Sequence, residues 1–338
     1  MLAPIIADIE RAGSIGGTQI TEALEMMMRG ECSTGEIESF LIGIKDLPLT
    51  AEVLAAGARV MRRFAVKLPQ ERPESLDTCG TGGDFSGSIN VSTLAAIVLA
   101  AGGVAVAKHG NRSNSGVCGS ADLLEGLGAR IDLAPERVLD GIDRIRFGFM
   151  FAPLFHPAMR FAGEARRRLR HKTIFNLMGP LSNPAGVRYQ TVGIFDAALV
   201  PVYLEALREL GTVRAMVFCG HDGMDEISLS APTLIGRLED GRISTEIFDP
   251  LSLPIIRSEP QSIKVKTRED AIKQAADVLG GCVGDSQTAI VALNAAAGFY
   301  IKNVCRSIED GYRMAQELLL KGKANEKLKE IIEDGKRG

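Results

Sequence analysis

The sequence predicts an α/β protein with a small all-helical N-terminal domain and a large α/β domain, whose central mixed, mostly parallel sheet is flanked by helices. Residues 1–70 show only helical periodicity of apolar side chains. A linker containing Pro69 and Pro73 follows. Beyond it, apolar strand-like runs alternate with helical segments, an order typical of a parallel sheet. We therefore assign 1–70 to the small domain, completed by helices from about 156–190, and 71–338 to the large domain.

Four apolar faces divide residues 1–70 into four helices. Their members recur at helical spacing: Ile5, Ile6 and Ile9; then Ile20, Ala23, Leu24 and Met27; then Ile37, Phe40, Leu41 and Ile44; then Val53, Leu54, Val60 and Met61. Thr50 is placed to cap the fourth helix, and Thr18 or Thr21 lies near the start of the second. A four-helix unit of this kind packs on itself or on a second subunit.

The large domain reads as strands and helices in alternation. Strands are expected at Val104–Ala107, Phe149–Phe151, Val192–Phe195 and Val213–Cys219, and in residues 227–248, with a turn at Asp240-Gly241. Helices are expected at Ala121–Leu127, Pro135–Ile145, His156–Leu169, Ala198–Leu210 and Asp285–Asn303. Thr267 and Ser307, each with an aspartate three residues later, predict two more helix starts. The charged tail Asn325–Gly338 is expected to be a fraying helix.

Composition excludes several classes of protein. The chain has 338 residues, 46% hydrophobic and 24% charged, which is ordinary globular material. A net charge of -3 argues against a general nucleic-acid binder. The longest apolar stretch, Leu94–Ala107, is too short to span a bilayer, and Met1–Arg11 lacks the apolar core of a signal peptide. Six scattered cysteines without a CxxC pair predict neither a zinc site nor a disulfide framework, and favour the cytoplasm.

The stretch Asp77–Thr93 carries the first candidate site. Gly80–Asp84 is a glycine-rich turn that ends in a carboxylate, and Asn90–Thr93 opens an apolar run of helical length. Glycine lets backbone N–H groups approach a ligand closely, and the N-terminus of a helix attracts anions. The stretch therefore predicts a cradle for phosphate or diphosphate. The competing interpretation is a turn that only joins packed elements.

A polar cluster, Lys108–Ser113, follows directly after an expected strand. Polar residues just past the carboxyl end of a strand lie where α/β folds bind ligands. Two cations, an imidazole, an amide and a hydroxyl within six residues predict an anion site, whereas the alternative is a solvated basic loop. Ser120, at the start of the next helix, is placed either to cap it or to contact a phosphate.

Two further clusters complete the candidate site. Asp225-Glu226 also follows an apolar strand, and neighbouring carboxylates suit Mg²⁺, although an isolated pair is more often a charged turn. Arg166 begins a run of three arginines, and its guanidinium fork suits a carboxylate. At least two of these three arginines are expected to be an exposed helix face. The loop Phe175–Pro184, with two prolines fixing the backbone, is expected to shape a pocket wall.

In this order the motifs GTGGD, NVST, KHGNRS, GSAD, FAPLFHPAMR, TIFNLMGPLSNP and GMDEIS resemble those of the anthranilate phosphoribosyltransferase family of tryptophan biosynthesis. The resemblance implies a glycosyltransferase with its active site at the hinge between the two domains. It implies transfer of phosphoribose from 5-phosphoribosyl diphosphate to the amine of anthranilate, giving N-(5-phosphoribosyl)anthranilate and diphosphate. It also implies a homodimer formed through the helical domain, with no nucleic-acid or membrane partner.

The resemblance assigns roles to residues of this chain. Donor contacts are implied for Gly80, Gly83, Asp84, Ser88, Asn90, Val91, Ser92, Thr93, Lys108, His109, Gly110, Asn111, Arg112, Ser113, Asn114, Ser115, Gly116 and Ser120. Anthranilate contacts are implied for Gly80, Asn111, His156, Arg166 and Pro180, with His109 lining that pocket. Ser92, Asp225 and Glu226 would hold Mg²⁺, two ions per subunit. Catalysis would rest on Arg166 and Asn111, which orient the acceptor, with a modest hydrogen-bonding or acid–base role for His109.

The chain departs from the family pattern in two places. Where the family reads SS(K/R)SGSAD, this chain has Ser115-Gly116-Val117-Cys118 before Gly119, so a cation and two hydroxyls are missing. Arg170 replaces a common glycine. Two other functions are compatible with the motifs. One is a pyrimidine-nucleoside-phosphorylase-like enzyme, which shares the fold; the other is a non-catalytic paralogue that binds nucleotides or nucleic acid.

Overall fold

The computed structural model of this chain describes residues 1–82, 87–113, 116–255, 258–281 and 285–337. The α-helices are α1 (Ala3–Ala12), α2 (Gly17–Arg29), α3 (Thr34–Gly43), α4 (Ala51–Phe64), α5 (Val91–Ala101), α6 (Ser120–Gly126), α7 (Pro135–Ile145), α8 (Ala152–Phe155), α9 (Arg160–Leu169), α10 (Ile174–Met178), α11 (Leu199–Glu209), α12 (Arg268–Leu279), α13 (Asp285–Ile301), α14 (Ile308–Leu320) and α15 (Lys323–Lys336). The strands are β1 (Leu76–Gly80), β2 (Val106–Gly110), β3 (Phe147–Phe151), β4 (Tyr189–Gly193), β5 (Arg214–Gly220), β6 (Thr233–Glu239) and β7 (Arg242–Phe248). Short 3-10 helices are η1 (Pro157–Met159), η2 (Pro180–Ser182), η3 (Pro250–Ser252) and η4 (Pro260–Ile263).

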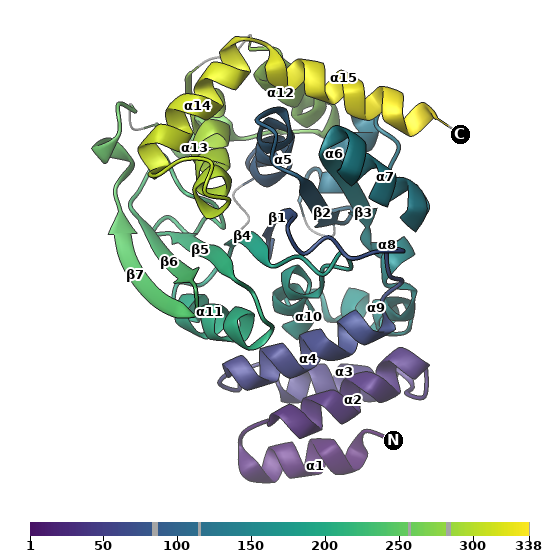
Figure 1. The fold of residues 1–338 in the computed structure, drawn as a ribbon. Coiled ribbons are helices and arrows are strands. Elements are labelled where there is room, and N and C mark those ends of the chain that lie inside the picture. The colour runs from purple at the N-terminus through teal and green to yellow at the C-terminus, as the bar shows by residue number, and fades with distance from the viewer. Residues whose placement is uncertain (83–86, 114–115, 256–257, 282–284, 338) are drawn as a thin grey trace.

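The four expected N-terminal helices are confirmed as α1–α4. Thr50 caps α4, because its hydroxyl accepts a hydrogen bond from Val53 N at 3.3 Å. These helices form the lower layer in Figure 1, and α9–α11 lie between them and the sheet. Buried side chains of α1–α4 share one apolar core with α11 and with one face of β4 and β5. Among the described residues, α1–α4 do not have an apolar core separate from that of the sheet. The domain boundary at residue 70 therefore stays a prediction.

The expected mixed, mostly parallel sheet is confirmed. Its seven strands lie in the order β3-β2-β1-β4-β5-β6-β7 (Figure 1). The first five are parallel, and β6 and β7 add antiparallel pairs at one edge. From β1 the chain proceeds outward through β2 and β3, and then returns to the other side of β1 with β4. The strand order thus reverses between β1 and β4, and such a switch point is where open α/β sheets bind ligands.

Two expectations about local structure are wrong. Strand β1 was not expected, because Leu76 is the only strongly apolar residue among its first three and the buried Asp77 and Thr78 conceal the pattern. A single helix over His156–Leu169 is also wrong. His156 has non-helical dihedral angles, since the residue before a proline is disfavoured in the helical region, and α9 begins only at Arg160.

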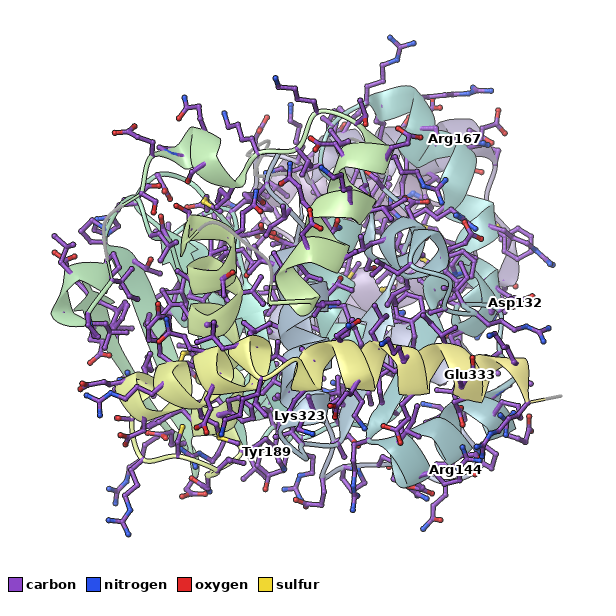
Figure 2. The ribbon with its side chains drawn as sticks, turned by 90° about the horizontal axis from the view of Figure 1, so that it is seen from above. Asp132, Arg144, Arg167, Tyr189, Lys323 and Glu333 are labelled. Carbon is purple, nitrogen blue, oxygen red and sulfur yellow. The ribbon has the colours of Figure 1, made fainter. Side chains whose placement is uncertain are left out.

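The tail does not fray, contrary to expectation. Leu328 and Ile331 of α15 are buried, and Asp334 is only 4% exposed, paired with Arg144 of α7. Figure 2 shows α15 running across the molecule with Arg144 beside it. Apart from Asp334, the charged side chains of this segment lie mainly on its outer face, while an apolar stripe at helical spacing packs inward.

Arg170 ends α9 in the left-handed region, with φ of 52°. A side chain in that conformation costs about 1–2 kcal/mol, which glycine avoids. Arg170→Gly is therefore expected to raise the free energy of unfolding by about 1 kcal/mol, measured by urea denaturation. Arg167→Gly, in the interior of the same helix, is the control and should lower it by about 1 kcal/mol. Equal losses in both variants would contradict this account of Arg170.

The five described cysteines, Cys32, Cys79, Cys118, Cys219 and Cys305, are free thiols, and Cys282 lies outside the described residues. Within the described part of the chain, no helix has both the length and the apolar character needed to cross a membrane.

Candidate active site

Two glycines at the switch point let distant segments meet. Gly80 ends β1 and pairs with Gly193, which ends β4. A Cβ atom on Gly193 would lie 1.5 Å from the backbone oxygen of Asp225, and one on Gly80 would lie 2.6 Å from Asp225 Oδ2. Only glycine therefore leaves room for the 225–226 segment to cross the carboxyl ends of these strands. Gly80 and Gly82 of the glycine-rich turn and the carboxylate of Asp225, separate in the sequence, are neighbours in the structure.

The two carboxylates accept hydrogen bonds from backbone groups of the expected cradle. Asp225 Oδ2 accepts from Gly82 N at 2.8 Å, and Glu226 Oε1 accepts from Ser92 N at 3.2 Å. Ser92 belongs to the first turn of α5, where the helix dipole favours negative charge. The two carboxylates therefore occupy backbone N–H donors of the kind that also bind anionic ligands.

The start of α5 is linked to the loop after β2. The helix begins at Val91, and Asn90 stands at the cap position without capping it. Instead, Asn90 Nδ2 donates to the backbone oxygen of Cys118 at 2.8 Å. Asn90 Oδ1 is buried and has no hydrogen-bond partner among the described residues. An unsatisfied buried oxygen of this kind indicates a polar ligand or water at the site.

Lys108 is not part of a solvated loop. It lies in β2, is 2% exposed, and its Nζ donates to the backbone oxygen of Thr78 and lies 3.3 Å from Ser92 Oγ. Burial lowers the pKa of Lys108, and the nearby carboxylates of Asp77 and Glu226 oppose that shift. Its ammonium therefore lies beneath the start of α5, where it adds positive charge to the anion-binding side of the helix.

Asp77 was not among the expected site residues. It is fully buried in β1, where its Oδ1 accepts from His109 N at 3.2 Å. Burial raises the pKa of Asp77, and Lys108 opposes that shift. Its sequence signal is a charged residue two positions before Cys79 and three before Gly80 of the turn. Asn183, in the loop after η2, ties the same region to β2 by donating to the Ala107 oxygen at 2.8 Å.

The remaining donor-site residues lie around the same edge. Asn111 and Arg112 are exposed, and the guanidinium of Arg112 is engaged by Asp122 at 2.9 Å and by Glu125 at 2.8 Å. Ser120 Oγ donates to the Asn111 oxygen at 3.1 Å, and Gly119 rather than Ser120 caps α6. Ser88 bridges to Lys264 outside the named strands. Gly83, Asp84, Asn114 and Ser115 lie outside the described residues.

His109, which is partly buried, and the buried His156 lie side by side. Their ring centroids are 4.9 Å apart, and each Nε2 is buried without a hydrogen-bond partner among the described residues. Burial lowers the pKa of His156 to about 4. Burial, reinforced by His156, holds the pKa of His109 well below its usual range. Both rings are therefore neutral at pH 7 and available for hydrogen bonds rather than for donating a proton as imidazolium.

The depressed pKa of His156 predicts a loss of stability in acid. The unfolded chain takes up this proton near pH 6.5, and the folded protein only near pH 4. The neutral His156 ring therefore contributes to the free energy of unfolding above pH 6.5. This contribution is lost as the pH falls from 6.5 to about 4, and the loss is at most about 3 kcal/mol. Urea midpoints between pH 7.5 and 4.5 should fall less steeply in His156→Asn than in the parent. The control is His221→Asn, at an exposed turn, and an identical slope in all three proteins would contradict the assignment.

Arg166 differs from its two neighbours. It is partly buried, its guanidinium lies 5.3 Å from the ring centroid of Phe175, and it makes no ion pair or hydrogen bond among the described residues. Burial lowers its pKa. Arg168 instead pairs with Glu164, and Arg167 is exposed at the rim of the molecule (Figure 2). A desolvated guanidinium without a protein counter-ion suits a ligand carboxylate.

The segment Phe175–Pro184, which is predicted to shape a pocket wall, is hydrogen-bonded to two other parts of the chain. Pro180 is buried in η2, and its backbone oxygen accepts from Gln190 Nε2 of β4 at 2.8 Å. Arg62 of α4 donates to the Leu181 oxygen at 2.7 Å. The loop therefore joins the N-terminal helices to the sheet directly beside the switch point.

The available metal ligands are hard oxygen donors. Glu226 lies against Ser92 at the start of α5, Asp225 lies against Gly80 and Gly82, and such carboxylate and hydroxyl oxygens fit Mg²⁺. No group of three or more His, Cys, Asp or Glu suited to a metal ion occurs among the described residues. These residues therefore fit Mg²⁺ only together with waters or ligand phosphate oxygens, which is how Mg²⁺ is usually bound.

Comparison with known proteins gives consistent matches. A family profile described as "Glycosyl transferase family, a/b domain" matches residues 72–325. Anthranilate phosphoribosyltransferase of Persephonella marina is 39% identical over 339 aligned residues, covering 100% of both chains. The crystal structure of that enzyme from Thermus thermophilus superposes with a TM-score of 0.91 at 36% identity and 98% coverage of each chain. The Saccharomyces cerevisiae enzyme, solved in complex with PRPP and Mg, has a TM-score of 0.86 at 24% identity, covering 95% of this chain and 93% of its own, and shows the shared fold.

Proposed function

This chain belongs to the anthranilate phosphoribosyltransferases, glycosyltransferases of tryptophan biosynthesis, and from that premise we propose how its residues divide the reaction. The substrates are 5-phosphoribosyl diphosphate and anthranilate. The observation that carries the proposal is the meeting of residues 80–82, 90–93 and 225–226 at the switch point between β1 and β4. One side of this edge binds the donor, and the side formed by α9 and η2 binds the acceptor.

The donor side consists of the glycine-rich turn, the start of α5 and the loop after β2. The dipole of α5 favours a phosphate group at the start of the helix, and the buried Lys108 adds positive charge beneath it. Asp225, Glu226 and Ser92 would hold Mg²⁺, two ions per subunit. When bound, Mg²⁺ supplies positive charge against the departing diphosphate. The Saccharomyces cerevisiae relative with PRPP and Mg supports this chemistry for the fold.

The acceptor side consists of Arg166, Asn111, Pro180 and the two histidines. Arg166 binds the carboxylate of anthranilate, because it is desolvated and lacks a protein counter-ion among the described residues. Asn111, directly after β2, orients the amine toward the ribose carbon. Neutral His109 and His156 offer Nε2 atoms that have no other described partner. A structure of the Saccharomyces cerevisiae relative contains 4-fluoroanthranilate, which supports an aromatic acid as the acceptor.

The chemistry needs little from a general base. The amine of anthranilate is neutral at pH 7 and attacks as it stands, losing its proton after the bond forms. The enzyme's task is to hold the acceptor in line and to stabilise the charge that develops on diphosphate. Orientation supplies up to about 7–11 kcal/mol in the best cases, and each well-placed donor roughly 3 kcal/mol. His109, neutral at pH 7, accepts a hydrogen bond rather than donating a proton.

The proposal extends to assembly and location. A homodimer forms through the helical layer, where Met1 and Ile42 are 58% and 56% exposed. The free thiols of the described cysteines support a cytoplasmic location.

One assay tests the proposed reaction. The purified chain is incubated with anthranilate, 5-phosphoribosyl diphosphate and Mg²⁺, and the change from substrate to product fluorescence is followed. Turnover is expected only when all three are present. Cleavage of thymidine by phosphate, without that turnover, would instead indicate the nucleoside-phosphorylase alternative. Binding without either reaction would indicate the non-catalytic alternative.

A further inference from the structure

Asn294, in the middle of α13, is a buried polar residue that lies outside all the predicted motifs. It is 3% exposed, and its Oδ1 accepts a hydrogen bond from Ile227 N at 2.9 Å. Its Nδ2 donates to the Ile227 oxygen at 3.1 Å and to the Ile290 oxygen, one turn earlier in α13, at 2.9 Å. Because Ile227 directly follows Glu226, one side-chain amide holds the backbone next to the carboxylate pair.

The segment that carries the carboxylate pair has no regular structure of its own. Residues 221–232, between β5 and β6, contain neither a helix nor a strand. Buried backbone groups in such a segment need partners from elsewhere in the chain. Ile227 is fully buried, and Asn294 pairs with both its N–H and its C=O, as a neighbouring strand would. The position of this backbone therefore depends on a side chain of α13.

Helix α13 also packs against the elements that the carboxylate pair contacts. It lies against α5, β4 and β5. A Cβ atom on Gly298 would lie 2.7 Å from the side chain of Leu99 in α5, so the two helices approach closely at this glycine. Ser92 at the start of α5 and Gly193 at the end of β4 both contact the pair. Asn294 therefore connects Ile227 to the framework on which the site is built.

We propose that Asn294 is a positioning residue for the metal site: through the backbone of Ile227 it holds Asp225 and Glu226 against the glycine-rich turn and the start of α5. The proposal rests on the function proposed above, in which these carboxylates bind Mg²⁺ together with diphosphate. Loss of a hydrogen bond that orients metal ligands typically lowers metal affinity by about 10–100-fold. Arg166 lies on α9, so anthranilate binding should be affected little.

Asn294→Leu removes both hydrogen bonds to Ile227 and keeps a side chain of similar volume. Calorimetry on the full chain should show Mg²⁺-diphosphate binding weakened by at least about 10-fold, and anthranilate binding changed less than about two-fold. Phe299→Leu is the control, because Phe299 is also buried in α13 but its ring lies against Gly102, beyond the other end of α5. Its affinities for both ligands should stay within about two-fold of the parent.

Hydrogen exchange of the Ile227 amide, measured without any ligand, tests the hold itself. In the parent this amide should exchange slowly, because its N–H is buried and bonded to Asn294 Oδ1. In Asn294→Leu it should exchange at least about 10-fold faster, and in Phe299→Leu at about the parent rate. If Asn294→Leu does not fold, Asn294→Ser, whose hydroxyl is too short to bond both groups of Ile227, should show the same two losses.

Three results would overturn the role of Asn294. These are fast exchange of the Ile227 amide in the parent, an unchanged affinity for Mg²⁺-diphosphate in a folded Asn294 variant, and an equal loss of both ligands in that variant. Failure of the parent chain to bind Mg²⁺-diphosphate would instead overturn the proposed function, and the exchange experiment would still report whether Asn294 holds Ile227.

Discussion

Arg166→Ala is expected to lower kcat/KM for anthranilate by about 100-fold, while the KM for the phosphoribosyl donor changes less than about two-fold. The guanidinium is desolvated beside Phe175, and no described carboxylate compensates it. A ligand carboxylate would therefore gain a charge-assisted, two-point interaction in a partly buried site. Removing the Arg166 guanidinium also leaves the anthranilate amine less firmly held, so part of the loss in kcat/KM should appear in kcat. Initial rates measured while the concentrations of both substrates are varied separate the change in kcat from the change in each KM.

Arg167→Ala is the matched control. It is the next residue in α9 and has the same side chain, but it is exposed at the rim of the molecule (Figure 2). Its Michaelis constants should equal those of the parent. Equal rises in both Michaelis constants of Arg166→Ala would show that Arg166 acts through structure or closure instead of contacting anthranilate.

Asp225→Asn combined with Glu226→Gln is expected to abolish activation by Mg²⁺ and to lower kcat by about 100-fold or more. The amide side chains still offer an oxygen to Gly82 N and Ser92 N, so the local hydrogen bonds have a replacement. What is lost is the negative charge that suits a hard cation. Rates measured against Mg²⁺ concentration, with a thermal melt of each protein, check both points.

Asp222→Asn is the control for this pair. Asp222 lies in the same turn, where its oxygens accept from Ser228 Oγ at 2.6 Å and from Met224 N at 3.3 Å. Asp222 is therefore a carboxylate that stabilises the turn close to Asp225 and Glu226 but is not one of the proposed metal ligands. The Mg²⁺ activation profile of Asp222→Asn should match the parent, whereas an unchanged profile in the double variant would refute the metal assignment.

Local patterns were sufficient for much of the fold. The helix Pro135–Ile145 has the expected bounds, because proline at its first position and an apolar stripe define it. The turn between β6 and β7 falls at Asp240-Gly241, both with positive φ, as two-residue hairpins require. These features depend on neighbours along the chain, which a sequence displays directly.

Features that depend on distant partners were harder to predict. Strand β1 is short and carries buried polar residues, whose partners come from β2 and from the loop after η2. The ion pairs of Arg112 with Asp122 and Glu125 were not predicted either, because they require α6 to fold back beside the loop. Likewise, Gly193 matters because Asp225 crosses it, a contact between residues 32 positions apart in the chain. The motifs therefore indicated which residues gather at the site, and the structure added how they hold one another.

The division of the site into two halves is tested most directly by equilibrium binding to three proteins. Calorimetry would measure Mg²⁺-diphosphate and anthranilate binding to the parent chain, to Arg166→Ala, and to Asp225→Asn with Glu226→Gln. The account predicts that the arginine variant loses anthranilate affinity and keeps that for Mg²⁺-diphosphate, and that the carboxylate variant does the opposite. Loss of both ligands in either variant, with the fold intact by thermal melting, would contradict it.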